Sequence, residues 1–158
     1  MSDREPSAEP EKPATLAETT RSGPGRVLIA VYAVFALGAT SRSVVQILMQ
    51  FDRAPLAYIL SAFAAVVYIV ATVCLGRASA TSRRVAVISC TVELIGVLAV
   101  GTASVLAPSA FPDATVWSVY GNGYFFIPVV LPILGLLWIR HTARAAAKAP
   151  QPEPASHS

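Results

Sequence analysis

Two charged side chains, Arg42 and Glu93, lie inside long apolar stretches of the sequence. Arg42 shares a helical face with Gln46, because residues four apart line up on one side of a helix. Tyr68 belongs to a similar face of small and polar residues on a second stretch. Charged residues inside a bilayer are costly and usually have partners within the protein. We therefore predict an intramembrane polar cluster formed by Arg42, Gln46, Tyr68 and Glu93.

Within this cluster, Arg42 and Glu93 are predicted to pair, directly or through Tyr68 or Gln46. Along their helices the two Cα atoms differ in height by about 9 Å, so a direct contact requires Arg42 to lean along its helix toward Glu93. Two alternatives stay open. Arg42 can extend to the lipid headgroups, and Glu93 can stay protonated and hydrogen-bonded to a hydroxyl group.

Residues that could perform catalysis are missing from the sequence. Its two cysteines and two histidines do not form a cluster with metal-ligand spacing. A phosphate-binding glycine loop and a nucleophile elbow are also lacking. Cys74 and Cys90 are predicted to be reduced packing residues. We therefore predict a protein that is not an enzyme and has no catalytic residue, no cofactor and no metal site.

Four apolar runs must position the polar residues. Hydrophobic residues make up 54% of the chain and charged residues only 13%, unlike a water-soluble domain. A bilayer core of about 30 Å requires about 20 helical residues. The runs predict membrane-spanning helices at about residues 27–51, 56–75, 85–107 and 123–139. The predicted fold is all-α, a polytopic membrane protein with four transmembrane helices in an antiparallel up-down bundle.

The basic residues predict the orientation of this bundle. Apart from Arg42 and Arg53, the twelve lysines and arginines fall before the first predicted helix, between the second and third, or after the fourth. The positive-inside rule then places both termini of this multi-pass protein in the cytoplasm. The basic residues lie near helix ends and are not interleaved with aromatic residues, so we predict no nucleic-acid partner.

The two ends of the chain differ from the middle in composition. Residues 1–25 and 142–158 are rich in Pro, Glu, Ser and Ala and lack apolar periodicity. Such segments are predicted to be disordered cytoplasmic tails, the second beginning with a basic juxtamembrane stretch. Residues 26–141 then form the membrane domain.

Aromatic residues crowd the connection between the third and fourth predicted helices. They are Trp117, Tyr120, Tyr124, Phe125 and Phe126. Their position near a predicted membrane boundary favours an aromatic belt at headgroup level. A docking surface is the alternative.

Three segments resemble a family of small integral membrane proteins of actinobacteria whose function is unknown: "GATSRSVVQ", "APLAYILSAFAAVVYIVATV" and "VWSVYGNGYFFIPVVLPILGLLWIR". The resemblance covers roughly residues 26–141. It implies a location in the cell membrane of a high-GC bacterium and supplies no activity and no functional residue.

The short loops favour a non-enzymatic role. We predict an accessory, assembly or interaction subunit that acts through helix–helix contacts, with membrane lipids and a larger membrane protein complex or a second copy as partners. The alternative is a small homo-oligomeric transporter in which Glu93 is the proton-coupling carboxylate.

Overall fold

The computed structural model describes residues 23–77 and 79–148, and every regular element within these ranges is helical. The predicted disorder of residues 1–22 and 149–158 lies outside the described part of the chain. Four long α-helices account for most of it: α2 (Gly23–Gln50), α3 (Pro55–Leu75), α4 (Ala80–Leu106) and α5 (Ile127–Lys148). Three short 3-10 helices connect them: η1 (Phe51–Arg53), η2 (Pro108–Ala110) and η3 (Ser118–Tyr124).

All four long helices are long and apolar enough to cross a membrane. They contain 28, 21, 27 and 22 residues, against the roughly 17 to 25 that a bilayer core requires. Large apolar side chains such as Leu37, Leu48 and Ile95 are exposed on their outer faces. Exposed leucines and isoleucines along all four helices are expected where lipid surrounds a protein. The prediction of a four-helix membrane protein is therefore confirmed.

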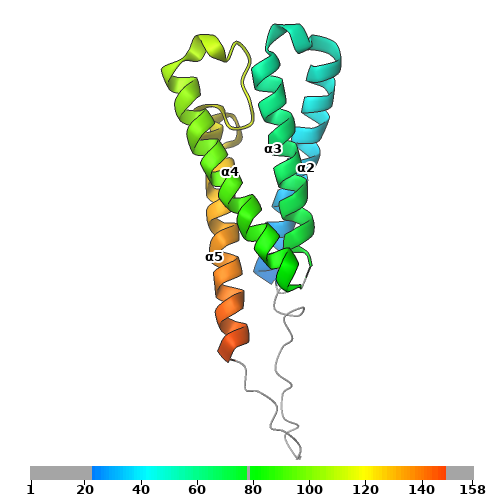
Figure 1. Cartoon of the computed structure of the whole chain (residues 1–158), viewed down its shortest axis with the longest axis vertical. Coiled ribbons are helices and arrows are strands. Elements are labelled where there is room, and N and C mark those ends of the chain that lie inside the picture. Colours follow the sequence, from blue (N-terminus) through cyan, green and yellow to red (C-terminus); the bar gives the residue numbers. More distant parts are fainter. Residues whose placement is uncertain (1–22, 78, 149–158) are drawn as a thin grey trace, which may run out of the picture.

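Successive helices run in opposite directions and pack on their neighbours in chain order, α2 on α3, α3 on α4 and α4 on α5 (Figure 1). Direct contact between α2 and α5 is sparse. Residues buried in α2 and α3 are mostly small, including Ala36, Ala39, Ser61 and Ala64. Small side chains let helix backbones approach closely, which is how helices associate in membranes.

The start of α2, the α3–α4 connection and the end of α5 lie at one end of the bundle (Figure 1). We call this the basic end, because it carries Arg26, Arg77, Arg83, Arg84, Arg140, Arg144 and Lys148. The α2–α3 connection lies at the opposite end.

The helix bounds differ from the predicted ones mainly at the basic end. α2 begins at Gly23 and α4 begins at Ala80, where the hydroxyl group of Ser79 accepts a hydrogen bond from the backbone of Ser82. α5 continues through residues predicted to be tail and ends at Lys148. Hydropathy detects only the apolar part of a helix. The polar residues at the helix ends were therefore left out, and the predicted helices are too short at the basic end.

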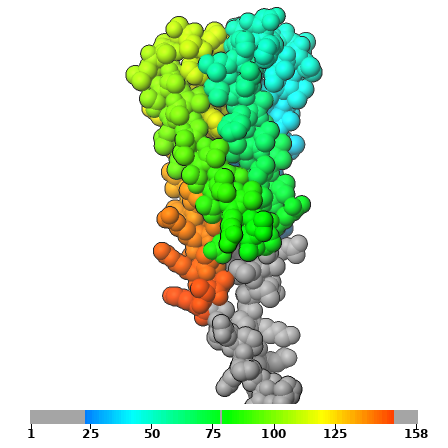
Figure 2. Space-filling model, in the orientation of Figure 1, coloured from blue at the N-terminus to red at the C-terminus, as the bar shows by residue number. Residues whose placement is uncertain are grey.

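Residues 107–126, here called the inserted segment, fold back into the bundle before α5 begins. Trp117 in this segment lies against Gly96, which precedes the end of α4 by about 15 Å of helix. The inserted segment therefore fills the space between α4 and α3 in the half of the bundle opposite the basic end (Figures 1 and 2). The predicted fourth helix was expected to reach this end from residue 123, whereas α5 begins only at Ile127.

Candidate functional site

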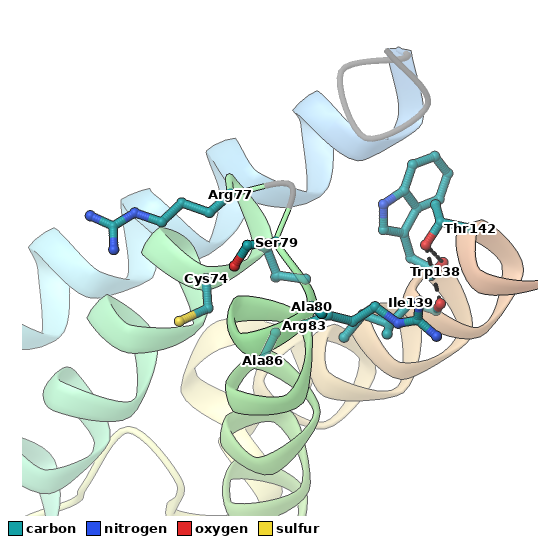
Figure 3. A pocket seen from close by; sticks show the side chains of 10 residues that line it. Cys74, Arg77, Ser79, Ala80, Arg83, Ala86, Trp138, Ile139 and Thr142 are labelled. Carbon is teal, nitrogen blue, oxygen red and sulfur yellow. Dashed lines mark hydrogen bonds between the residues drawn. The ribbon is translucent and has the colours of Figure 1, made fainter. Parts of the chain in front are cut away.

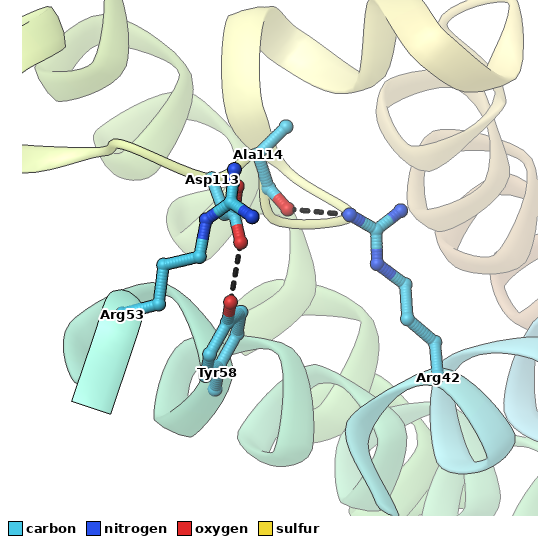
Figure 4. Close-up of polar contacts among 5 residues, drawn as sticks. All are labelled: Arg42, Arg53, Tyr58, Asp113 and Ala114. Atoms are coloured by element: carbon cyan, nitrogen blue, oxygen red, sulfur yellow. Dashed lines mark hydrogen bonds and ion pairs between the residues drawn. The ribbon is translucent and has the colours of Figure 1, made fainter. Parts of the chain in front are cut away.

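Arg42 holds the inserted segment from α2 (Figure 4). Its Nη2 atom donates a hydrogen bond of 2.8 Å to the backbone oxygen of Ala114, and its Nη1 atom donates one of 3.0 Å to the hydroxyl oxygen of Tyr124. Its Nε atom donates a third, of 3.3 Å, to the side-chain oxygen of Gln46. The planar guanidinium group suits this task because it donates in several fixed directions at once. Arg42 therefore stays inside an apolar stretch because it binds another part of the chain.

Asp113 forms a second attachment of the same segment (Figure 4). The hydroxyl group of Tyr58, at the start of α3, donates a hydrogen bond to Asp113 Oδ2. Arg53 in η1 lies 3.4 Å from Asp113 Oδ1, measured from its Nη2 atom. Because the Arg53 side chain is 66% exposed, this ion pair contributes little by itself. The buried Tyr58 is the stronger anchor of the two.

Trp117 is the central anchor of the inserted segment. Its side chain is only 1% exposed, and its Nε1 atom donates a hydrogen bond of 3.1 Å to the hydroxyl oxygen of Tyr68. Gly96 makes room for it, since a Cβ atom at that position would lie 2.5 Å from the indole ring. Phe63 packs edge-on against the same ring with centroids 6.1 Å apart. The segment is thus fixed by α2, α3 and α4 together.

The prediction of an aromatic belt is wrong for the buried member of the set. Trp117 points into the bundle, and the partly buried Tyr124 and Tyr120 hydrogen-bond to Arg42 and Thr102. Phe125 and Phe126 alone among the five residues present large exposed surfaces, at 88% and 48%. An aromatic cluster in a sequence does not show which side the rings face, because the answer depends on a chain reversal that hydropathy does not predict.

Glu93 lies in a separate polar site deeper in the bundle. It is fully buried, and its Oε2 atom accepts a hydrogen bond of 2.8 Å from the hydroxyl group of Tyr32. The same hydroxyl group is 3.4 Å from Cys90 Sγ. The second carboxyl oxygen, Oε1, is buried and has no hydrogen-bond partner in the described chain. α5 closes this site at Gly135, where a Cβ atom would lie 2.8 Å from Cys90 Sγ and 3.3 Å from the Tyr32 hydroxyl oxygen.

The four residues of the predicted cluster therefore separate into three sites. Arg42 bonds to Gln46, Tyr68 bonds to Trp117, and Glu93 bonds to Tyr32. The predicted pairing of Arg42 and Glu93 is not formed, and no chain of hydrogen bonds connects them within residues 23–77 and 79–148. The physical reason is that Arg42 satisfies its donors on the inserted segment, which the sequence placed outside the bundle.

Aromatic rings pack between the Arg42 site and the Glu93 site. Phe35 packs edge-on against both Tyr124 and Tyr68, with centroids 5.8 and 5.7 Å apart. Tyr68 then lies 6.3 Å from Tyr32, between ring centroids. Tyr32 was missed by the sequence analysis, although it precedes Phe35 and Arg42 at helical spacing and so marks the inward face of α2.

No family model, curated protein or solved structure matches this chain, so the function is inferred from its own residues.

Proposed function

We propose that this chain is a non-enzymatic interaction subunit of a membrane protein complex, and that it binds its partner through Phe125 and Phe126. The observation that carries the proposal is the backbone at these two residues. Their φ angles are 55° and 59°, in the left-handed region that residues with side chains seldom adopt. Both side chains are nevertheless exposed.

Left-handed residues of this kind cost of order 1 to 3 kcal/mol each and persist only where the surrounding structure imposes them. Val119 and Tyr120 have φ angles of 49° and 59° as well. Arg42, Trp117 and Asp113 supply the constraint, because each attaches the inserted segment to a helix. Arg42, Trp117 and Asp113 thus hold the inserted segment in shape, and that segment presents two phenylalanines to its surroundings.

A transmembrane helix of another protein is the partner that fits this surface. Phe125 and Phe126 immediately precede α5, a helix long and apolar enough to cross a membrane, so an apolar partner suits them. Rigid aromatic side chains are favoured at the centre of binding surfaces because they bury much area at little cost in side-chain entropy. This deepens the helix–helix role expected from the sequence.

Site-specific photocrosslinking in native membranes tests the proposal. A photoreactive phenylalanine analogue at position 125 should yield one discrete adduct with another membrane protein. The same analogue at Ile88, a 61% exposed residue of α4, is the matched control and should label lipid alone. Equal adducts at both positions, or lipid labelling alone at position 125, would contradict the proposal.

A homo-oligomeric proton-coupled transporter is a second candidate, favoured by the buried Oε1 atom of Glu93. A buried carboxyl group with one free oxygen is suited to binding and releasing a proton. Glu93→Gln keeps an oxygen that can accept from Tyr32 but removes the titratable group. Proton-gradient-dependent uptake that disappears in Glu93→Gln vesicles would support the transporter, and adducts of position 125 with a second copy of the chain would agree with it.

The proposed orientation places both termini in the cytoplasm and the inserted segment toward the outer face of a bacterial cell membrane. The gathering of arginines and Lys148 at the basic end supports this orientation.

A further inference from the structure

The sparse contact between α2 and α5 leaves a groove along the side of the bundle. Its volume is about 620 Å³, within the usual range of ligand sites. The lining residues come from the first turns of α2 and most of α5, and all but one are apolar or aromatic. The exception is His141, which lies at the basic end of the groove.

Beyond the groove, the face of α5 that lines it carries two cationic residues. Trp138 and His141 line it at a spacing of three residues, and their rings stack with centroids 6.2 Å apart. Arg144 and Lys148 follow His141 by three and seven residues, so they extend the same helical face. Both are exposed. This face of the bundle is therefore apolar along the membrane, aromatic near its boundary and cationic beyond it.

We propose that the α2–α5 groove binds one anionic phospholipid, with an acyl chain between the two helices and the phosphate group at His141, Arg144 and Lys148. The charge pattern selects this occupant, because basic residues at the end of an apolar membrane groove bind acidic headgroups. The length agrees: from Ile127 to His141 the groove follows α5 for about 21 Å, enough for the chain of one leaflet, which is about 15 Å thick.

A neighbouring basic pocket provides the control. It has a volume of about 120 Å³ and lies between the α3–α4 connection and α5, on the other side of Trp138 (Figure 3). Arg83 extends from α4 toward α5 there. Arg83 belongs to the same basic end as Arg144 but does not line the groove. Removing Arg83 takes away one positive charge, as removing Arg144 alone does, without touching the proposed site.

The test is lipid retention by the full-length protein, counted by native mass spectrometry after release from bilayer discs that contain phosphatidylglycerol and phosphatidylcholine in equal amounts. The wild type should retain one phosphatidylglycerol in preference to phosphatidylcholine. Arg144→Gln should reduce this preference by about fivefold, and adding Lys148→Gln should reduce it by about fivefold again. Arg83→Gln should leave it unchanged. Equal retention of the two lipids by the wild type, or an equal effect of Arg83→Gln, would overturn the proposal.

Filling the groove gives an independent readout. Leu134→Trp places a large ring among the lining residues, whereas Ile133→Trp adds the same ring on a similarly exposed residue outside the groove. The first should abolish lipid retention and the second should not. If Leu134→Trp does not fold, the wild-type protein still provides a test. Phosphatidylglycerol is titrated into phosphatidylcholine discs that contain the protein, and binding should saturate at one phosphatidylglycerol per chain. Displacement by millimolar inorganic phosphate, or a second chain in place of the lipid, would refute the proposal.

Discussion

Arg42 is the residue that attaches the inserted segment to α2. It contributes hydrogen bonds to a backbone oxygen and to a side chain that are both far from it in sequence. Arg42→Leu should therefore lower the free energy of unfolding by about 2 to 3 kcal/mol, because charged hydrogen bonds are lost and the oxygen of Ala114 is left without this donor. Chemical or thermal unfolding in detergent measures the change.

A double-mutant cycle distinguishes the contact of Arg42 with Tyr124 from the predicted pairing of Arg42 with Glu93. Arg42→Leu and Tyr124→Phe should be coupled by roughly 0.5 to 2 kcal/mol, because these side chains share a hydrogen bond. Arg42→Leu and Glu93→Gln should be additive within about 0.5 kcal/mol. Strong coupling between Arg42 and Glu93 would show that the two sites communicate through the aromatic rings between them.

Gly96 offers a sharp test of the Trp117 anchor. Gly96→Ala should destabilise the fold and change the fluorescence of the indole, because the new Cβ atom would overlap the ring. Gly38→Ala is the matched control on another long helix, since its Cβ atom would meet nothing within 4 Å. There the substitution should be neutral or stabilising by about 0.5 to 1 kcal/mol. If Gly96→Ala and Gly38→Ala destabilise the fold to a similar extent, Trp117 does not pack against Gly96.

At the scale of the elements, the orientation of the bundle can be tested at two exposed positions. Ser109 lies in η2 and Ala146 near the end of α5. We expect Ser109→Cys to react with a membrane-impermeant maleimide in intact cells and Ala146→Cys to react only after permeabilisation. The unsubstituted chain measures the background from Cys74 and Cys90. Labelling of Ala146→Cys in intact cells would reverse the proposed orientation.

The attachment of α5 to the rest of the bundle depends on the absence of a side chain at Gly135. Gly135→Ala should lower the thermal midpoint, because its Cβ atom would lie 2.8 Å from Cys90 Sγ. Cys90→Ala removes the sulfur, so the double variant should recover most of the loss. If the double variant is no more stable than Gly135→Ala alone, another contact limits the approach of α5.

At the scale of the whole molecule, α3 packs on α2 and α4, and α4 packs on α3 and α5. The sparse contact between α2 and α5 leaves the groove between them. The inserted segment closes the bundle away from the basic end, and the groove opens its side. The surfaces proposed for a protein partner and for a lipid are thus different: one is presented by Phe125 and Phe126 and the other by the groove.

The sequence alone determined that this is a membrane protein with four spanning helices, because apolar runs of this length are stable as helices in lipid whatever their neighbours. It also identified Arg42 and Glu93 as residues that need partners, since charge burial is costly in any fold. Which partners they have was decided by the tertiary structure alone. The return of residues 107–126 into the bundle brings Ala114 and Tyr124 to Arg42 and leaves Glu93 with Tyr32. Contacts between residues distant in sequence leave no periodic signal, so the chain reversal that creates them could be recognised only in three dimensions.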